Sequence, residues 1–238
     1  MKPPLQPPPL SPWTAEIGFR MRKLFWLKLL GTTAVTSAFF IGYFYVLRHP
    51  VFPVAVMPEL ALDRWIGFHP WGLFVYLSLW FYIGVGPGLE RGFWELVVYG
   101  LWLTAMCLTG LLMFYLWPTA VPPLGFDASG FPGFALLQGV DAAGNACPSL
   151  HVATAMFTTI RIEQVLRNAG TPRWPRIINA LWFIAIAWST LAVKQHVALD
   201  ALAGAALGIA FALPSMRWRP GAQQLSSSTT RIAEQNTP

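Results

Sequence analysis

The chain has 238 residues, of which 55% are hydrophobic and only 11% are charged. Soluble domains usually carry about 25% charged residues, so the composition argues against a water-soluble globule and leaves a soluble helical protein with an unusually apolar core as the weaker alternative. The net charge is +6, but the basic residues stand at the ends of apolar runs instead of gathering on one face, which argues against nucleic acid as a partner.

Both ends of the chain differ from its middle. Residues 1–24 begin with a proline-rich segment and are predicted to be a disordered cytoplasmic tail. Residues 216–238 are polar and show no apolar period, which predicts a second disordered cytoplasmic tail. Residues 25–215, between the tails, are predicted to form one transmembrane domain.

Six apolar stretches make up this middle part, and each approaches the roughly 17–25 residues that a helix needs to cross a bilayer. The predicted fold is therefore all-α, a polytopic membrane protein with a six-helix transmembrane bundle. The predicted spans are 25–47, 70–89, 93–117, 149–166, 177–193 and 197–214. The first apolar run is longer than the apolar part of a typical signal peptide, which favours an uncleaved helix. The fourth and sixth spans are rich in small residues and are expected inside the bundle.

The Lys and Arg residues divide unequally between the two sides of such a bundle. If the N-terminus is inside, Arg48, Arg64 and Lys194 lie outside and the other thirteen lie inside. Positive charge accumulates on the cytoplasmic side of membrane proteins, which predicts that both termini are cytoplasmic. A bacterial inner membrane fits this pattern, and an organelle membrane would look similar. The connection 118–148 has no Lys or Arg and is expected outside, where loops of such length are functional or disordered.

The fourth span begins with the residues CPSLHVA at positions 147–153. Ser149 suits the N-cap of a helix, and a helix N-terminus with its unpaired N–H groups is a ready anion site. His151, in the first turn, can donate a proton to a leaving oxygen. The alternative is a capped helix whose histidine faces the lipid head groups.

The end of the fifth span, the connection after it and the start of the sixth span read STLAVKQHVALD at positions 189–200. His196 and Asp200 are four residues apart and share a helix face. A carboxylate that accepts from one imidazole nitrogen leaves the other nitrogen free to attack. Lys194 is predicted to bind phosphate, with a head-group anchor as the alternative. A metal held by His151, His196 and Asp200 is the weaker hypothesis, and no metal or cofactor is predicted.

These two segments resemble the second and third signature motifs of the type 2 phosphatidic acid phosphatase (PAP2) superfamily, Pro-Ser-Gly-His and Ser-Arg-x5-His-x3-Asp. Residues 62–70 are similar to bacterial members, though more weakly. The resemblance implies a six-helix membrane core with its site at the outer face. It also implies that His196 is a nucleophile that forms a phosphohistidine, that Asp200 orients it, and that His151 is the general acid. The implied phosphate-binding residues are Ser149, Ser189, Thr190 and Lys194.

Three departures separate the chain from the family's pattern. The first motif, Lys-x6-Arg-Pro, has no counterpart after the third span, Thr190 stands in place of the motif arginine, and Leu150 replaces the glycine. Removing one transition-state donor costs roughly 10²–10³ in rate, so the missing cations must be offset or the activity is low. Leu150 and the Lys-Gln-His run resemble the branch that includes inositol phosphorylceramide synthases, which transfer head groups.

The predicted function is hydrolysis of a lipid phosphomonoester or pyrophosphate at the outer membrane face, with a lipid phosphate as the partner. One alternative is a lipid head-group phosphotransferase that uses the same His-His-Asp site, because the sequence does not decide between water and an alcohol as acceptor. A second alternative is a catalytically weak membrane protein that binds lipid phosphate, an interpretation supported by the missing first motif.

Overall fold

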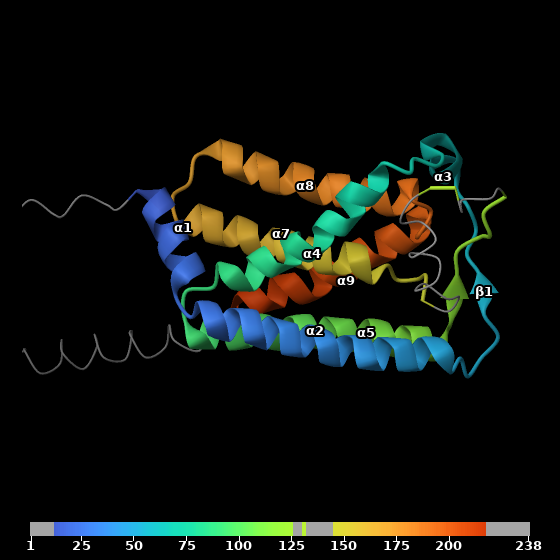
Figure 1. Cartoon of the computed structure of the whole chain (residues 1–238), viewed down its shortest axis with the longest axis horizontal. Helices are drawn as coiled ribbons and strands as arrows, with labels where there is room; N and C mark the ends of the chain where they lie inside the picture. The colour runs from blue at the N-terminus through green and yellow to red at the C-terminus, as the bar shows by residue number, and fades with distance from the viewer. Residues whose placement is uncertain (1–11, 126–129, 132–144, 218–238) are drawn as a thin grey trace, which may run out of the picture.

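The computed structural model describes residues 12–125, 130–131 and 145–217 (Figure 1). The helices in these ranges are α1 Trp13–Arg22, α2 Phe25–Arg48, α3 Ala61–Ile66, α4 Gly72–Gly88, α5 Phe93–Leu116, α7 Leu150–Asn168, α8 Arg173–Ala192 and α9 Ala198–Arg217. Two short strands, β1 Ala55–Val56 and β2 Thr119–Ala120, pair in parallel. The described part of the chain is mostly helical, as the composition predicts. The strand pair, which was not predicted, ties the α2–α3 connection to the segment after α5.

Six long helices lie close to the six predicted spans, but their ability to cross a membrane differs. Helices α2, α5, α8 and α9 are long and apolar enough to span a bilayer. Helix α4 has 17 residues, at the lower limit of a span, and α7 carries Arg161, Glu163 and Arg167 in its second half. Four spans are thus supported by length and composition, and the count of six stays a prediction.

The tail predicted over residues 1–24 is wrong in part, because Trp13–Arg22 form α1. Arg20 pairs with Glu16 one turn earlier at 2.8 Å and donates to the Leu89 carbonyl at 3.2 Å. Lys28, at the start of α2, donates to the Arg20 carbonyl at 2.7 Å. The contact between Arg20 and Leu89, 69 residues apart, holds α1 against the end of α4 and could not be predicted from a local pattern. Residues 1–11, and 218–238 of the C-terminal tail, lie outside the described residues.

Helix α7 contacts α4, α5, α8 and α9, and its closest neighbour is α9. Two glycines of α9 permit this approach. A Cβ at Gly208 would lie 2.6 Å from the Ala153 carbonyl oxygen, and one at Gly204 would overlap the Ser149 carbonyl. Small residues at such spacing let helix backbones pack closely. The predicted fourth and sixth spans are therefore in direct contact, with the motif residue Ser149 at their meeting point.

The two ends of the bundle differ (Figure 1). Helix α1 and the end of α9 lie at one end, while α3 and the β1–β2 pair lie at the other. The beginnings of α7 and α9 also lie at the α3 end, so the histidines of both motifs are brought there. Among the described residues, the basic side chains near this end are Arg48, Arg64 and Lys194. The outer side predicted from charge thus corresponds to one physical end of the molecule.

Candidate active site

Ser149 caps α7 as predicted, since its hydroxyl accepts a hydrogen bond from the Val152 N–H at 3.3 Å. Its own N–H donates to the Asp200 carbonyl at 3.0 Å. The start of α7 is therefore tied directly to the start of α9. Leu150, in place of the family's glycine, packs against Gly110 of α5, where an added Cβ would overlap its side chain. The missing glycine is thus matched by a glycine on the facing helix.

A left-handed turn at the end of α8 places His196. Lys194 has a φ of 57°, a conformation that commonly terminates helices. The Thr190 carbonyl then accepts from the Gln195 N–H at 3.0 Å and from the His196 N–H at 3.2 Å. Thr190 therefore helps to position the histidine, and it does so through its backbone.

His196 is held at one ring nitrogen by a backbone acceptor, with a carboxylate nearby at longer range. Its Nδ1 lies 3.0 Å from the Ala146 carbonyl oxygen and 3.7 Å from Asp200 Oδ2. Since a carbonyl can only accept, Nδ1 carries the proton, and Nε2 of the neutral ring keeps a lone pair. Asp200 Oδ2 also accepts from the Val197 N–H at 2.9 Å, at the third position of α9, where an acidic residue can cap a helix. The carboxylate is thus both a helix cap and the charge behind His196.

His151 lies directly against His196. Its Nδ1 is 3.3 Å from His196 Nε2, and its Nε2 is 2.6 Å from the Tyr76 hydroxyl. Tyr76 comes from α4, a helix that contributes nothing to either motif. The three residues His151, His196 and Asp200 are thus adjacent although they come from α7, the α8–α9 connection and α9.

The hydroxyls predicted to bind phosphate on α8 are occupied within that helix. Ser189 donates to the Ile186 carbonyl at 2.7 Å, and Thr190 donates to the Ala187 carbonyl at 2.8 Å. Both side chains are fully buried. In this part of the described chain they act as helix residues, so nothing in their contacts supports direct phosphate binding.

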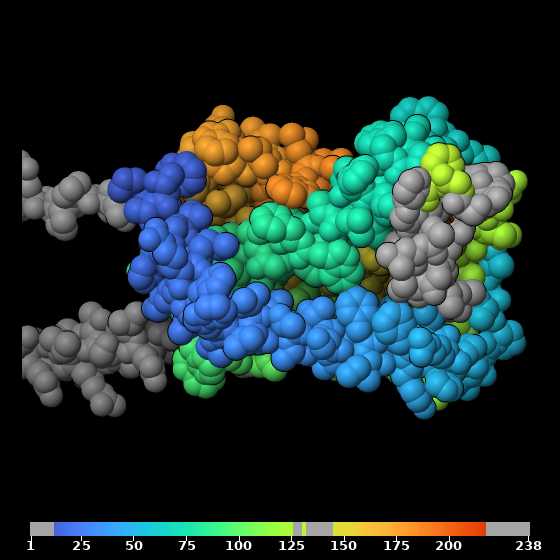
Figure 2. Space-filling model, viewed as in Figure 1, coloured from blue at the N-terminus to red at the C-terminus, as the bar shows by residue number. Residues whose placement is uncertain are grey.

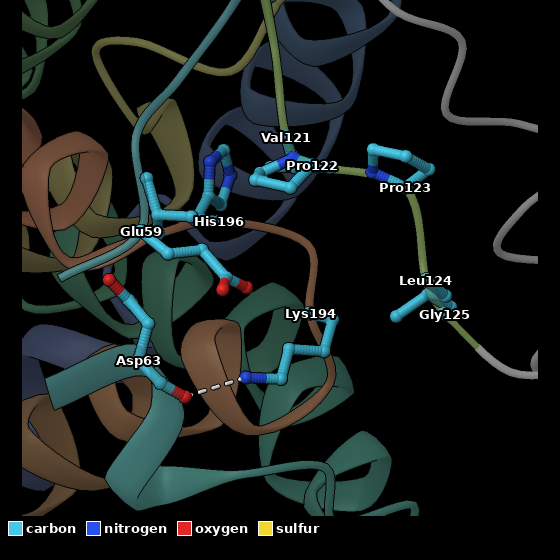
Figure 3. Close-up of a pocket in the computed structure, with 10 residues that line it drawn as sticks. Glu59, Asp63, Val121, Pro122, Pro123, Leu124, Gly125, Lys194 and His196 are labelled. Atoms are coloured by element: carbon cyan, nitrogen blue, oxygen red, sulfur yellow. Dashed lines mark hydrogen bonds between the residues drawn. The ribbon is translucent and has the colours of Figure 1, made fainter. Parts of the chain in front are cut away.

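Lys194 lines a small polar pocket of about 100 Å³ beside His196 (Figure 3). Its ammonium group donates to the Asp63 carbonyl at 2.8 Å, and Glu59 lies on the same side of the pocket. The backbone segment from Val121 to Gly125 faces them. Lys194 is therefore next to the site, with its charge directed at a carbonyl of α3.

Asp63 is a structural residue of the site that sequence reasoning missed. Its Oδ1 accepts from the Ala198 N–H at 2.8 Å, and its Oδ2 accepts from the Leu60 N–H at 2.8 Å. It is buried to 1% exposure. The carboxylate therefore links α3 to the N-terminus of α9. Residues 62–70 are weakly similar to bacterial members, and the single acid in that segment, Asp63, is the sequence signal that could have identified this structural role.

A second and larger cavity reaches His151 and His196 from the side of the bundle. Its volume is about 600 Å³, and its walls come from α2, α4, α5 and α7. Most lining residues are apolar, while Tyr43, Tyr76 and Asn145 add polar groups near the histidines. Figure 2 shows a hollow between α2 and α4 on this face, with α7 at its floor. The imidazoles thus lie where an apolar cavity meets the polar end of the bundle.

A cysteine thiolate and a bound metal are the other possible sources of chemistry in the described residues. Burial, with a contribution from Asp200, raises the pKa of the Cys147 thiol to about 11, so this cysteine stays a thiol at neutral pH. Within the described ranges, no group of three His, Cys, Asp or Glu side chains is arranged to hold a metal ion. The chemistry that these residues offer is nucleophilic and acid–base chemistry by imidazole.

Fold and site together define a helical membrane protein with a His-His-Asp cluster at one end of its bundle. The profile of the PAP2 superfamily matches residues 103–224, just over half of the chain and all of α7, α8 and α9. The chain therefore belongs to the PAP2 superfamily, whose members act on lipid phosphates as phosphatases or phosphotransferases. No curated protein and no solved structure gives a match, so the narrower branch stays a proposal.

Proposed function

We propose that this protein is a lipid phosphatase of the PAP2 superfamily that acts through a phosphohistidine on His196. The observation that carries the proposal is the contact between His151 Nδ1 and His196 Nε2 at 3.3 Å, at the inner end of an apolar cavity. A nucleophile with a free lone pair and a proton donor beside it are what phosphoryl transfer needs. Phosphoryl transfer otherwise depends on positioning and charge stabilisation.

In the first step, the Nε2 lone pair of His196 attacks phosphorus and forms the N–P bond. The O–P bond to the lipid breaks, and His151 protonates the departing oxygen. Asp200 and the Ala146 carbonyl stabilise the positive charge that develops on the His196 ring, since both lie beside its Nδ1. Substrate binding must separate the two imidazoles, because the phosphoryl group enters where they now touch.

In the second step, His151 removes a proton from water, and the resulting O–P bond replaces the N–P bond. Free phosphate leaves and both histidines return to their starting protonation states. The same residue thus serves as acid and then as base, as microscopic reversibility requires for a two-step displacement on one site.

The apolar cavity supports a lipid as substrate. Its volume of about 600 Å³ lies within the range typical of small-ligand sites, about 300–1,000 Å³. It opens between α2 and α4 toward the side of the bundle (Figure 2), which is the hydrocarbon side if the long helices span a membrane. A lipid tail in this cavity would place its phosphate at His196.

The missing first-motif cations call for another source of charge stabilisation. Polar groups at the inner end of the apolar cavity are Tyr43, which accepts from the Asn145 amide, and the Tyr76 hydroxyl. Lys194 lies on the other side of His196. We propose that these neutral donors and Lys194 replace the arginine and lysine clamp, together with the capped N-terminus of α7 at Ser149.

We further propose that six helices span the membrane, with both termini cytoplasmic and the site outside. Exposed tryptophans at the two ends suit the two interfaces of a bilayer. They are Trp65, Trp71 and Trp117 at the α3 end and Trp26, Trp94 and Trp174 at the other. In a Cys147→Ser background, Phe52→Cys should react with an impermeant thiol reagent in intact cells, and Thr171→Cys should react only after permeabilisation. The reverse pattern would invert the proposed topology.

The activity test uses purified protein in detergent with phosphatidic acid and with a polyprenyl pyrophosphate, scoring phosphate release and acid-labile protein phosphate. Wild type should release phosphate, while His196→Ala should lose about 10⁴-fold or more in kcat and trap no phosphate on the protein. His49→Ala, an exposed histidine at the end of α2, is the matched control and should behave as wild type. Undiminished turnover in His196→Ala would rule the mechanism out.

A head-group phosphotransferase related to inositol phosphorylceramide synthases is the second candidate, favoured by the polar pocket on the far side of His196. Glu59 and Lys194 there offer a hydrogen-bond acceptor and donor to a hydroxyl-bearing group. The phosphohistidine chemistry is the same, with an alcohol in place of water. Product analysis with a phosphatidylinositol donor and a ceramide acceptor separates the two, because a transferase gives a phosphodiester product. Substrate binding without release or transfer would favour a non-catalytic lipid-phosphate binder.

A further inference from the structure

The positions of the protons on the His151 and His196 rings follow from one fixed hydrogen-bond acceptor. The Ala146 carbonyl lies 3.0 Å from His196 Nδ1 and can only accept. His196 Nε2 is then the acceptor of the neutral ring, so the His151 Nδ1 that lies 3.3 Å away must be the donor. A proton on His151 therefore faces the proposed nucleophilic atom. The remaining nitrogen, His151 Nε2, faces the Tyr76 hydroxyl at 2.6 Å.

The partner of His151 Nε2 must suit more than one protonation state. When His151 is neutral with its proton on Nδ1, Nε2 is an acceptor and the Tyr76 hydroxyl donates to it. When His151 is an imidazolium, Nε2–H is a donor and the same hydroxyl oxygen accepts. A phenolic hydroxyl can do both, whereas a carbonyl or an ammonium group can do only one.

The environment of Tyr76 fits such a role. The side chain is 4% exposed, and its ring lies against the His151 ring with centroids 4.8 Å apart. Ring packing and the hydrogen bond together fix both the distance and the direction of His151. Tyr76 also lines the apolar cavity, so the contact lies beside the route proposed for substrate.

From this geometry we infer that Tyr76 is a positioning residue that keeps the His151 Nδ1 aimed at the nucleophile while His151 loses and regains one proton. The inference rests on the proposed phosphoryl transfer. The resting neutral ring accepts from Tyr76 at Nε2, and when Nε2 takes up a proton from solvent, the Tyr76 hydroxyl becomes the acceptor. In the first step, this imidazolium His151 gives its Nδ1 proton to the leaving oxygen and keeps Nε2–H, which donates to Tyr76. In the second step, the Nδ1 lone pair takes the proton of the attacking water, and the imidazolium is restored. Tyr76 keeps its own proton throughout.

The hydrogen bond between Tyr76 and His151 should affect the pH dependence of kcat in one direction. A hydrogen bond from a charged donor is roughly twice as strong as one between neutral groups, so Tyr76 favours the protonated form of His151. The other titratable groups near His151 act on its pKa in the same way whether or not the Tyr76 hydroxyl is present. On the described elements packed around His151, they are His196, Asp200 of α9, Cys107 of α5 and Tyr43 of α2.

The test is Tyr76→Phe, which keeps the ring that packs on His151 and removes the hydroxyl. We expect kcat to fall by at least about tenfold with KM nearly unchanged, because general acid–base catalysis contributes about 10²–10⁴-fold. The high-pH limb of the kcat profile should move to lower pH by about one unit. The matched control is Tyr82→Phe, on the same helix, whose hydroxyl bonds to Thr159 and Asn179. It should leave the profile in place.

Two outcomes overturn the inference while leaving the proposed function intact. One is a kcat profile in Tyr76→Phe that coincides with wild type. The other is an equal displacement in Tyr82→Phe, which would mark a general effect of α4. An inactive wild type, or activity that survives His196→Ala, would instead sink the proposed function. In that case the nitrogen NMR signals of labelled histidine still decide on the contact, since the His151 ring signals should change in Tyr76→Phe and stay fixed in Tyr82→Phe.

Discussion

Two buried polar clusters lie near opposite ends of the bundle and have different surroundings. Near the α1 end, Arg161 pairs with Glu90 at 2.6 Å and donates to the Ser215 carbonyl at 3.1 Å. Near the α3 end, His151, His196 and Asp200 are adjacent. The small pocket and the apolar cavity both reach His196. Neither of them is lined by Arg161 or Glu90.

Burial and charge alone do not distinguish the two clusters. Burial raises the pKa of Glu90, and the neighbouring Arg161 guanidinium opposes this rise only in part. Each cluster holds one buried atom without a hydrogen-bond partner in the described residues, Arg161 Nε near the α1 end and Asp200 Oδ1 near the α3 end, so the two clusters differ in their access to a cavity. A buried ion pair away from both cavities can act only on the fold, whereas groups beside a cavity can also act on a ligand. Substitutions in each cluster separate these two roles.

The largest expected effect is on rate, from Asp200→Asn. The amide can still accept from the Val197 N–H and cap α9, but the negative charge behind His196 is lost. We expect kcat to fall by about 10²–10⁴-fold with little change in melting temperature, as when the acid of a catalytic triad is neutralised. Asp63→Asn is the control, because this equally buried acid caps the same helix. An equal loss of kcat in both variants would show that the effect is on the helix.

Arg161→Met should lower the stability and leave kcat nearly unchanged, the reverse of what is expected for Asp200→Asn. It leaves Glu90 buried without its partner, so the free energy of unfolding should fall by about 3–5 kcal/mol, while kcat per folded molecule stays near wild type. Unfolding in mixed detergent with activity measured on the folded fraction checks both. Arg167→Ala removes a pair whose arginine is 64% exposed and should cost less than about 1 kcal/mol. A loss of kcat in Arg161→Met without destabilisation would connect the two clusters.

Gly208→Leu should affect both properties, because α9 packs against the backbone of α7 at this point. Overpacking of this kind costs about 1–3 kcal/mol, and it should also move Asp200 relative to His151 and lower kcat. The measurement is melting temperature together with kcat. Gly84→Leu is the control, since an added Cβ there meets nothing within 4 Å. If Gly208→Leu is as stable and active as Gly84→Leu, the close α7–α9 contact does not matter.

The smallest predicted effect concerns the apolar cavity. Ala38→Trp places a large ring in its α2 wall and should raise KM for a long-chain lipid about fivefold, since displacing part of a tail loses roughly 1 kcal/mol of apolar burial. Turnover of a short-chain substrate should not change. Ile41→Trp, on the exposed side of α2 at 75% exposure, is the matched control. Equal KM values for long-chain lipid in both variants would place the tail elsewhere.

Much of the molecule follows from local sequence patterns. Apolar runs located the six long helices to within a few residues, and Ser149 as a cap followed from residue type. Local patterns suffice there because helix formation and capping depend on neighbours within a few residues. The expected helix face shared by His196 and Asp200 was wrong in part, because His196 lies in the connection before α9, although it is still near Asp200.

Other features depend on contacts between distant segments, and the tertiary structure alone decided them. Tyr76 was one aromatic residue among many in an apolar span until α4 brought it within 2.6 Å of His151. Thr190 and Ser189 looked like phosphate ligands, yet their hydroxyls bond to carbonyls one turn back on α8. The sequence by itself determined where the long helices lie and which residues are candidates for the chemistry. Which groups surround those residues, and where cavities reach them, depends on side-chain packing between helices, which no local pattern encodes.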